Sequence, residues 1–215
     1  MPELTRELIL DLPQNGPTDP ILFYRRPLVG WLYRERINLG LRLLPPRRFE
    51  SVLEIGYGAG ALLLTLAPIA DKLTGLDLDA DPAPVKALLG ARGIAEPTLH
   101  RGSVYDIPAG DASFDLVVSY SVFEHLENYR RALSEVRRVL RPGGLFLLGM
   151  PAVNLMMEAG FRAIGFKGIE DHHVTTPDAV RRAFEAAGLR LTASKDFVFP
   201  VPGVKIYFTW LLERA

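Results

Sequence analysis

Short apolar segments alternate with stretches of helical periodicity between residues 50 and 150, and this alternation most constrains the fold. It predicts a parallel sheet with right-handed helical crossovers, since parallel neighbours need a long connection between them. Two later apolar segments share only a short link, so we expect them to pair antiparallel. The expected strands are residues 51–55, 72–78, 97–104, 114–121, 145–150, 189–199 and 204–212, and the expected helices are residues 61–71, 81–93, 129–140 and 176–187.

Length and composition narrow the class of protein. The chain has 215 residues, which suits one domain with a full core, and its 25 basic residues are balanced by 25 acidic ones. This balance gives no global attraction to nucleic acid or to an anionic membrane. The chain has no cysteine, which excludes disulfides, thiolate metal sites and a cysteine nucleophile.

The N-terminal residues resemble neither a signal peptide nor a membrane span. Residues 1–20 are acidic and interrupted by prolines, without the basic start and apolar centre of a signal peptide. No uncharged apolar run approaches the roughly 18 residues that a bilayer requires. We therefore expect a cytoplasmic protein without stable membrane insertion, in which residues 1–20 are a loose lead-in and residues 21–44 form a helix or two.

A glycine-rich turn follows the first core strand, in the sequence VLEIGYGAG at residues 52–60. Gly56, Gly58 and Gly60 allow the backbone to approach a ligand closely. A phosphate-binding P-loop needs Lys-Ser/Thr after its last glycine, whereas an alanine and a leucine follow Gly60. The pattern does satisfy the dinucleotide fingerprint G-x-G-x-x-G/A, so an NAD(P)-binding oxidoreductase is an alternative.

Two acids distinguish between these ligands. Glu54 lies two residues before the first glycine, where a carboxylate repels a pyrophosphate and attracts a cationic amino group. Asp77 ends the second strand, where a carboxylate can accept hydrogen bonds from two ribose hydroxyls. Together they favour a nucleoside that carries positive charge and no phosphate, and S-adenosylmethionine has this chemistry.

The glycine segment, extended to VLEIGYGAGALLLTLA, resembles the first motif of class I S-adenosylmethionine-dependent methyltransferases. Residues 102–151 resemble the subfamily of small-molecule methyltransferases that includes enzymes of quinone biosynthesis. The resemblance implies a Rossmann-like three-layer α/β/α sandwich, with a seven-stranded mixed sheet and an antiparallel C-terminal strand. It also implies S-adenosylmethionine as cofactor and S-adenosylhomocysteine as product, and it is not specific for a substrate.

The same resemblance suggests how one methyltransferase domain over residues 1–215 is divided. The expected parts are an N-terminal helical segment on the acceptor side (1–49), a cofactor-binding core (50–150), an acceptor-side insertion (151–175), and a C-terminal helix and strands (176–215).

Cofactor contacts are implied residue by residue. Glu54 and the three glycines would face the methionine part and the ribose, Asp77 would hold the ribose hydroxyls, and Leu78 would pack on the adenine. Relatives commonly have an aspartate at the position of Ser103, so the contact to the adenine amino group is weaker, water-mediated or made by Asp106. The implied contacts also include the backbone of Val104, with Ser119, Tyr120 and His125 beside the methionine end.

Methyl transfer is an in-line displacement, so the enzyme chiefly aligns the nucleophile and excludes water. A base is needed only when the acceptor atom carries a proton that it must lose. His125, His172 and His173 are the candidates for this catalytic role, with a surface pair of histidines as the alternative for the last two. No metal site is predicted.

The acceptor site is expected from residues 20–44 and 151–175, which contain aromatic and methionine side chains. These suit a small apolar or aromatic acceptor, although the same residues equally suit an ordinary core. Nucleic acid is not expected, because the arginine pairs are scattered and balanced by acids. A non-catalytic module that binds S-adenosylmethionine or a partner is a further alternative. The aromatic and apolar residues in question are Phe23, Tyr24, Trp31, Tyr33, Leu155, Met156, Met157, Phe161 and Phe166.

Overall fold

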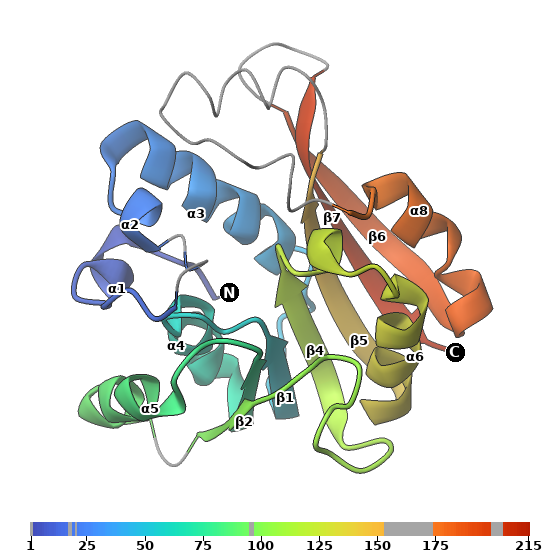
Figure 1. The fold of residues 1–215 in the computed structure, drawn as a ribbon, viewed down its shortest axis with the longest axis horizontal. Helices are drawn as coiled ribbons and strands as arrows, with labels where there is room; N and C mark the ends of the chain where they lie inside the picture. Colours follow the sequence, from blue (N-terminus) through green and yellow to red (C-terminus); the bar gives the residue numbers. More distant parts are fainter. Residues whose placement is uncertain (1, 17–18, 20, 95–96, 153–173, 199–203) are drawn as a thin grey trace.

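A computed structural model of the chain describes residues 2–16, 19, 21–94, 97–152, 174–198 and 204–215. Its centre is a seven-stranded sheet in the order β3-β2-β1-β4-β5-β7-β6. Helices cover both faces of this sheet, which gives the three layers expected from the alternation of strands and helices (Figure 1). The predicted fold class is therefore confirmed.

The sheet is mixed in the predicted way. Its first five strands in the chain are parallel to one another, whereas β7 lies between β5 and β6 and is antiparallel to both. The central strands are buried along almost their whole length because helices cover both of their faces. The strands are β1 (Phe49–Ile55), β2 (Ala70–Asp77), β3 (Thr98–Arg101), β4 (Phe114–Tyr120), β5 (Leu140–Pro151), β6 (Leu189–Val198) and β7 (Lys205–Arg214).

Two hydrophobic clusters, one on each face, join the helices to the sheet. One cluster contains side chains of the helices that precede β3, and the other contains side chains of α6 and α8. The first group comprises α1 (Arg6–Ile9), α2 (Ile21–Tyr24), α3 (Pro27–Leu41), α4 (Ala61–Leu66) and α5 (Pro82–Ala91), and the second comprises α6 (Tyr129–Val139) and α8 (Pro177–Arg182).

The helices predicted to begin at residues 81 and 176 both start with a side-chain cap. The side chain of Asp81 accepts a hydrogen bond from the backbone N–H of Ala83, and a proline occupies the first turn of α5. Thr176 accepts in the same way from Ala179 at the start of α8. These side chains satisfy backbone donors that have no partner inside the helix, so the local sequence fixes where each helix begins.

Three predicted boundaries are wrong, and in the first of them the helix expected over residues 176–187 ends at Arg182, before a separate 3-10 turn. The helix expected over residues 61–71 ends at Leu66, and a 3-10 turn that contains Pro68 leads directly into β2. The strand expected over residues 145–150 begins at Leu140, since α6 ends at Val139 and the chain continues directly as β5. Ion pairs from Arg141 to Glu50 and Asp115 accompany this extended start.

The expectation of a loose lead-in over residues 1–20 is also wrong for the part that the structure describes. Leu4, Ile9 and Leu12 are at most 1% exposed and belong to the hydrophobic cluster under α3 and α4. The side-chain amide of Asn38 in α3 binds both backbone groups of Leu4, at 2.8 and 3.2 Å. Apolar burial therefore outweighs the prolines that made this segment look irregular.

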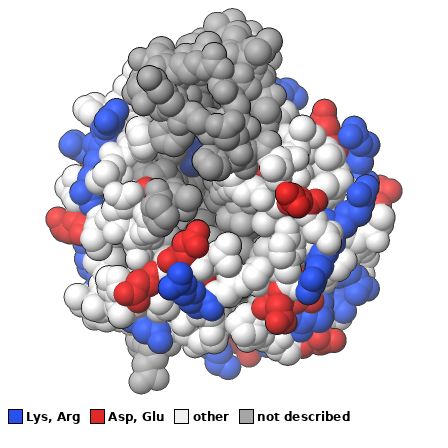
Figure 2. Space-filling model, in the orientation of Figure 1, with Lys and Arg blue, Asp and Glu red and all other residues white. Residues whose placement is uncertain are grey.

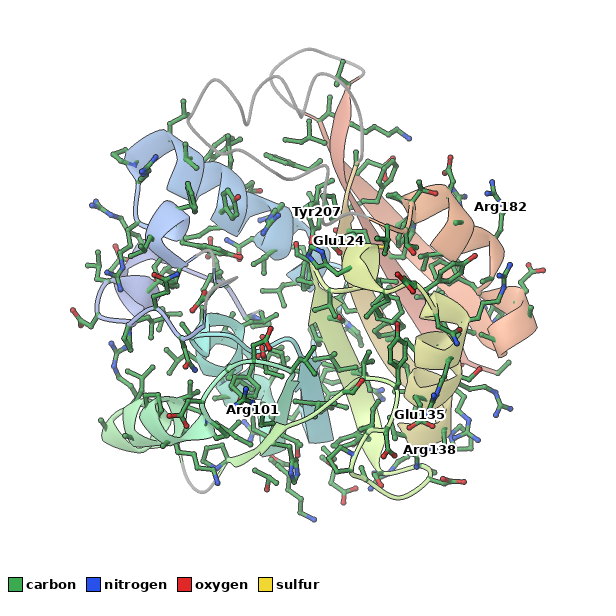
Figure 3. The ribbon with its side chains drawn as sticks, in the orientation of Figure 1. Arg101, Glu124, Glu135, Arg138, Arg182 and Tyr207 are labelled. Carbon is green, nitrogen blue, oxygen red and sulfur yellow. The ribbon has the colours of Figure 1, made fainter. Side chains whose placement is uncertain are left out.

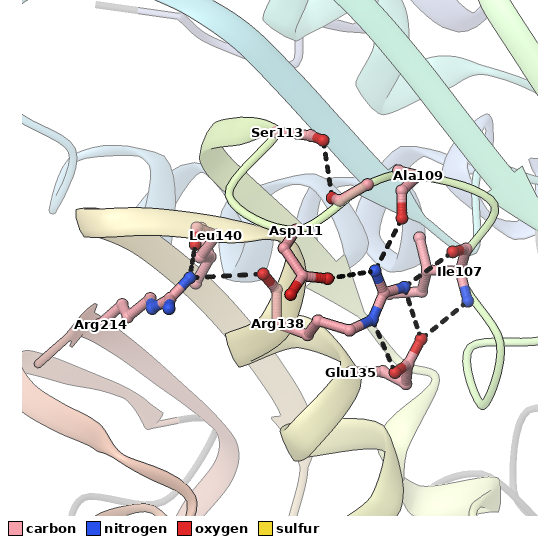
Figure 4. A network of polar contacts seen from close by, with 9 residues as sticks. Ile107, Ala109, Asp111, Ser113, Glu135, Arg138, Leu140 and Arg214 are labelled. Carbon is pink, nitrogen blue, oxygen red and sulfur yellow. Dashed lines mark hydrogen bonds and ion pairs between the residues drawn. The ribbon is translucent and has the colours of Figure 1, made fainter.

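The loop between β3 and β4 is fixed to α6 by one arginine (Figure 4). The guanidinium of Arg138 pairs with Glu135 at 2.9 Å and with Asp111 at 3.1 Å. It also donates to the carbonyls of Ile107 and Ala109. This network lies away from the glycine turn and holds the loop that precedes β4.

Helix α3 lies very close to the sheet at Gly40. A Cβ atom at this position would collide with the hydroxyl of Tyr120 in β4 and with the side chain of Thr209 in β7. The Tyr120 hydroxyl donates to the carbonyl of Ile37 in the same helix. A glycine is therefore required here, and it sets the distance between α3 and the ends of the central strands.

Candidate functional site

The three glycines after β1 adopt backbone conformations that other residues rarely adopt. Gly56, Gly58 and Gly60 have φ angles of +84°, +46° and +83°. Side chains would also collide there, because a Cβ at Gly56 would meet Val122 and a Cβ at Gly60 would lie 2.7 Å from Val85. The turn thus needs glycine for conformation and for space, and it leads directly into α4.

Glu54 is a buried acid without a hydrogen-bond partner for one of its oxygens. Its side chain is 3% exposed, and Oε2 has no partner among the described residues. Burial raises the pKa of this carboxyl well above its usual range, and the nearby charge of Asp77 raises it further. A positively charged donor group would relieve both penalties, so the site fits the ammonium of an amino acid.

Asp77 connects the end of β2 to the glycine turn. One carboxylate oxygen accepts from the backbone N–H of Gly58 at 2.9 Å, and the other accepts from Asp79 and Ala80 at 2.9 Å. The next residue, Leu78, is 63% exposed, as a platform for a flat ring must be. A carboxylate oxygen has more than one lone pair, so these bonds leave capacity for a ligand hydroxyl.

Two residues of the N-terminal segment lie over this turn, and the sequence analysis missed both. The side chain of Asn15 donates to the carbonyls of Gly58 and Asp81 at 2.9 Å and accepts from the Asp81 N–H at 3.1 Å. The carboxylate of Asp19 lies 3.5 Å from where a Cβ on Gly58 would stand. The helical spacing of Leu8, Ile9 and Leu12 could have indicated an ordered segment, but no pattern indicates Asn15.

The loop after β3 reaches the same edge of the sheet. The Gly102 N–H donates to the carbonyl of Asp77 at 2.8 Å. The hydroxyl of Ser103 accepts from the backbone N–H of Tyr105 at 3.2 Å, so it closes its own turn, and Val104 is buried. The structure therefore brings Ser103 and Val104 to the side of Asp77, where the adenine contact was predicted.

Ser119 and Tyr120 end β4, and their side chains point to opposite faces of the sheet. Ser119 is fully buried, pairs in register with Ile55 of β1, and its hydroxyl has no partner among the described residues. The Tyr120 side chain supports α3 through Ile37. Contacts of these residues with the methionine end therefore stay a prediction, which for Tyr120 involves the backbone.

The predicted catalytic histidines are only partly within the described structure. His125 lies in the 3-10 turn after β4, its side chain is 46% exposed, and its Nε2 is 3.9 Å from Oε1 of Glu124. His172 and His173 lie outside the described residues, as do the predicted acceptor residues from Leu155 to Phe166. Over the described parts of the chain, no three acidic or histidine side chains are grouped to hold a metal.

The aromatic residues predicted to line the acceptor site gather on α2 and α3. The rings of Phe23 and Tyr33 stack at 6.1 Å, and Tyr24 meets Tyr33 at 5.0 Å. Trp31 meets Phe197 of β6 edge-on at 6.1 Å. These contacts place an aromatic surface on α2 and α3. Helix α3 also contacts the end of β4, because the carbonyl of Ile37 accepts a hydrogen bond from Tyr120.

Comparison with known proteins gives matches over the same core. Residues 53–148 match the family described as methyltransferase domain. A probable S-adenosylmethionine-dependent methyltransferase of Mycolicibacterium smegmatis is 40% identical over 103 residues, which are 47% of this chain and 38% of that protein. The phthiotriol/phenolphthiotriol dimycocerosates methyltransferase of Mycobacterium tuberculosis is 37% identical over 99 residues, 45% of this chain and 36% of that one.

A solved structure shares the fold over most of the chain. The PH0226 protein of Pyrococcus horikoshii OT3 superimposes with a TM-score of 0.71 and 15% identity, covering 88% of this chain and 93% of that one. The two curated relatives are longer, since the matched segments span 38% and 36% of their lengths. The sequence matches thus concern the core, whereas the fold extends over most of the chain.

Proposed function

We propose, from the match of residues 53–148 to the methyltransferase-domain family, that the whole chain transfers a methyl group from S-adenosylmethionine to a small apolar or aromatic molecule. The matched relatives support S-adenosylmethionine as cofactor and S-adenosylhomocysteine as product. We further propose an acceptor chemistry close to that of the quinone-biosynthesis methyltransferases, on the resemblance of residues 102–151.

The observation that carries this proposal is the unpartnered, buried Oε2 of Glu54 beside a turn of three positive-φ glycines. An ammonium group would give this carboxyl both a hydrogen bond and a compensating charge. Asp77 would bind the ribose, with Leu78 exposed beside it for the adenine. When bound, the cofactor supplies an electrophilic methyl group on a sulfonium that is already a good leaving group.

The protein itself would chiefly orient the reactants and exclude water. Asn15 and Asp19 cover the glycine turn from one side, and α3 covers the end of β4 through Ile37 and Tyr120. Holding the acceptor in line with the methyl group is the main catalytic contribution that such a site can make.

The dinucleotide alternative is not favoured. A pyrophosphate at this turn would lie beside Glu54, Asp77 and Asp19. Repulsion between these carboxylates and the negatively charged pyrophosphate makes binding less favourable. A non-catalytic module would keep the cofactor site and lack an acceptor site. Turnover of methyl-labelled cofactor against a metabolite extract separates this alternative from an enzyme.

The proposal includes a small acceptor in the cytoplasm and excludes nucleic acid. Basic and acidic side chains are interspersed over the face in Figure 2, without the continuous basic surface that phosphate binding favours. None of the helices in the described segments combines the length and the apolar character needed to cross a membrane.

Titration calorimetry tests the proposal. We expect both S-adenosylmethionine and S-adenosylhomocysteine to bind, and NAD(H) not to bind. Glu54→Gln keeps the shape of the side chain but cannot carry the negative charge that pairs with an ammonium. We therefore expect the variant to bind S-adenosylmethionine with a free energy that is less favourable by roughly 1–3 kcal/mol. Absence of binding at millimolar S-adenosylhomocysteine would refute the proposal.

A further inference from the structure

A second group of buried polar atoms lies at the end of β4, apart from Glu54 and the glycine turn. Glu124, in the 3-10 turn after β4, is 1% exposed, and its Oε2 has no hydrogen-bond partner in the described structure. Arg36 of α3 has a buried Nε that likewise lacks a partner there. Two ionisable side chains therefore each keep one buried hydrogen-bonding atom without a partner in the described structure.

Tyrosines and a serine connect these two side chains. The Arg36 guanidinium lies over the rings of Tyr33 and Tyr207, at 4.4 and 4.7 Å from their centroids. The Tyr207 hydroxyl and the Ser121 hydroxyl are 3.0 Å apart. Figure 3 shows Glu124 and Tyr207 close together beside the end of β4. The group thus combines two aromatic rings and a cationic donor with a carboxyl whose pKa the charge of Arg36 lowers.

The backbone at this point is held in an unusual conformation. Ser121 has a φ of +55°, which is uncommon for a residue other than glycine and is found at functional sites. Its N–H donates to the carbonyl of Gly149, and its hydroxyl faces Tyr207. The strained residue therefore aims a polar side chain into the same group of atoms.

We propose that Glu124 and Arg36 bind the hydroxyl group of a phenol-like acceptor, and that Glu124 takes the hydroxyl proton as the oxygen receives the methyl group. This inference rests on the proposed methyl transfer and adds to it the class of acceptor and the base. The next residue, His125, has a half-exposed side chain, so the protein surface is close to the buried carboxyl of Glu124.

A hydroxyl oxygen is the kind of nucleophile that can form hydrogen bonds with both Glu124 Oε2 and Arg36 Nε. A hydroxyl donates its proton to the carboxylate, and it has two lone pairs, so one can accept from Arg36 Nε while the other attacks. A neutral amine has a single lone pair, which the reaction consumes. Arg36 would then have no acceptor, and a buried unpaired donor is costly. The tyrosine rings suit an aromatic body for the acceptor.

The step balances as a substitution. The acceptor oxygen forms a bond to the methyl carbon, and the carbon–sulfur bond breaks with its electron pair left on sulfur. The proton passes to Glu124, so a phenol, a sulfonium and a carboxylate become a methyl ether, a thioether and a carboxylic acid. Arg36 stays protonated throughout and stabilises the charge that develops on oxygen.

The surroundings of Glu124 give its carboxyl a pKa that suits it to accept the hydroxyl proton. Burial raises the pKa of this carboxyl to about 8, although its own backbone N–H, the charge of Arg36 and the Ser121 hydroxyl each lower it. Among the residues that the structure describes, its charged and titratable neighbours are Arg36 from α3, Tyr207 from β7 and His125 from its own turn. A base that titrates near the working pH is the most effective one.

Binding of small probes tests the acceptor class without turnover. The protein is saturated with S-adenosylhomocysteine and titrated with phenol, toluene and aniline, with binding followed by NMR. We expect phenol to bind at millimolar concentration. Toluene should bind at least tenfold more weakly because it has no polar atom for either group, and aniline likewise because its lone pair, delocalised into the ring, is a poor acceptor for Arg36. Arg36→Met should remove the preference for phenol. Equal binding of phenol and toluene, or no binding of phenol, would overturn the inference.

Turnover of catechol tests the role of Glu124. We expect Glu124→Gln to lower kcat/KM by roughly 10²–10⁴-fold with unchanged affinity for S-adenosylhomocysteine. In the wild type kcat/KM should rise with pH to a plateau above about pH 8, and Arg36→Met should move this rise to higher pH. The control is Glu127→Gln, an exposed neighbour that should behave as wild type.

The outcomes separate methyl transfer itself from the role of Glu124. A wild-type protein that binds no S-adenosylhomocysteine refutes methyl transfer. If the protein binds it, but the wild type and the Glu124→Gln variant methylate catechol equally well, only the base is refuted. Failure to methylate catechol while phenol binds would also overturn the role of Glu124, and a flat pH profile would do the same.

Discussion

The carboxylate of Asp77 accepts a hydrogen bond from the backbone N–H of Gly58 at 2.9 Å. This bond joins the end of β2 to the turn after β1, its neighbour in the sheet, across 19 positions of the chain. The same carboxylate binds the N–H groups of Asp79 and Ala80. A residue predicted for a ribose contact therefore also fixes the shape of the site that would hold the ribose.

Replacing Asp77 is therefore expected to affect both cofactor affinity and stability. Asp77→Ala should weaken S-adenosylhomocysteine binding by roughly 1–3 kcal/mol and lower the free energy of unfolding by a similar amount, because three backbone donors lose their acceptor. Asp77→Asn, which keeps one acceptor oxygen, should lie between. Calorimetry and urea unfolding measure the two effects, and Asp79→Ala is the exposed control. An unchanged affinity would contradict the predicted ribose contact.

Asn15 is expected to support the same turn from the N-terminal segment. It is 8% exposed and forms three hydrogen bonds with Gly58 and Asp81. Asn15→Ala leaves these groups without partners, so the free energy of unfolding should fall by roughly 1–3 kcal/mol, with weaker cofactor binding. Gln14→Ala is the control, since Gln14 has one long, exposed bond to Gly16. Equal stability of the two variants would argue against this support.

The core of the fold and its glycine turn could be predicted because their signals are local. Apolar strands, the caps at Asp81 and Thr176, and glycines with positive φ each depend on a few neighbouring residues. Glu54 was noticeable because an acid in an otherwise apolar strand is unusual. These features report backbone conformation and burial, which a sequence pattern carries directly.

The rest depended on contacts between distant segments. Asn15 reaches Gly58 across 43 positions of the chain, and Arg36 lies over the ring of Tyr207 from another element. Nothing in the sequence around Glu124 distinguishes this buried glutamate from an exposed one beside a histidine. Its burial follows from the way that the 3-10 turn packs, and no local pattern encodes this packing.

The close approach of α3 to the sheet gives a steric prediction. Gly40→Ala would force Cβ against Tyr120 and Thr209, so we expect a loss of about 1–3 kcal/mol in the free energy of unfolding. Gly90→Ala in α5 is the matched control, because nothing lies within 4 Å of its Cβ position. There the change should be neutral or stabilise by up to about 1 kcal/mol. Comparable losses in both variants would contradict this packing of α3.

The burial of Glu124 predicts a dependence of stability on pH. An unfolded glutamate loses its proton near pH 4.5, whereas the folded carboxyl keeps its proton until about pH 8. Between these values the folded state binds more protons than the unfolded state, so the stability that Glu124 contributes falls as the pH rises. The slope for one group is at most about 1.4 kcal/mol per pH unit.

Glu124→Gln removes this titration and leaves the other buried acids, including Glu54, in place. The free energy of unfolding of the variant minus that of the wild type should therefore increase from about pH 4.5 to about pH 8 and stay constant above. Urea unfolding at a series of pH values measures this difference, with Glu127→Gln as the exposed control. Parallel curves for wild type and Glu124→Gln would mean that the carboxyl ionises in the folded protein as it does in water, and the buried, unpartnered state of Glu124 would then be wrong.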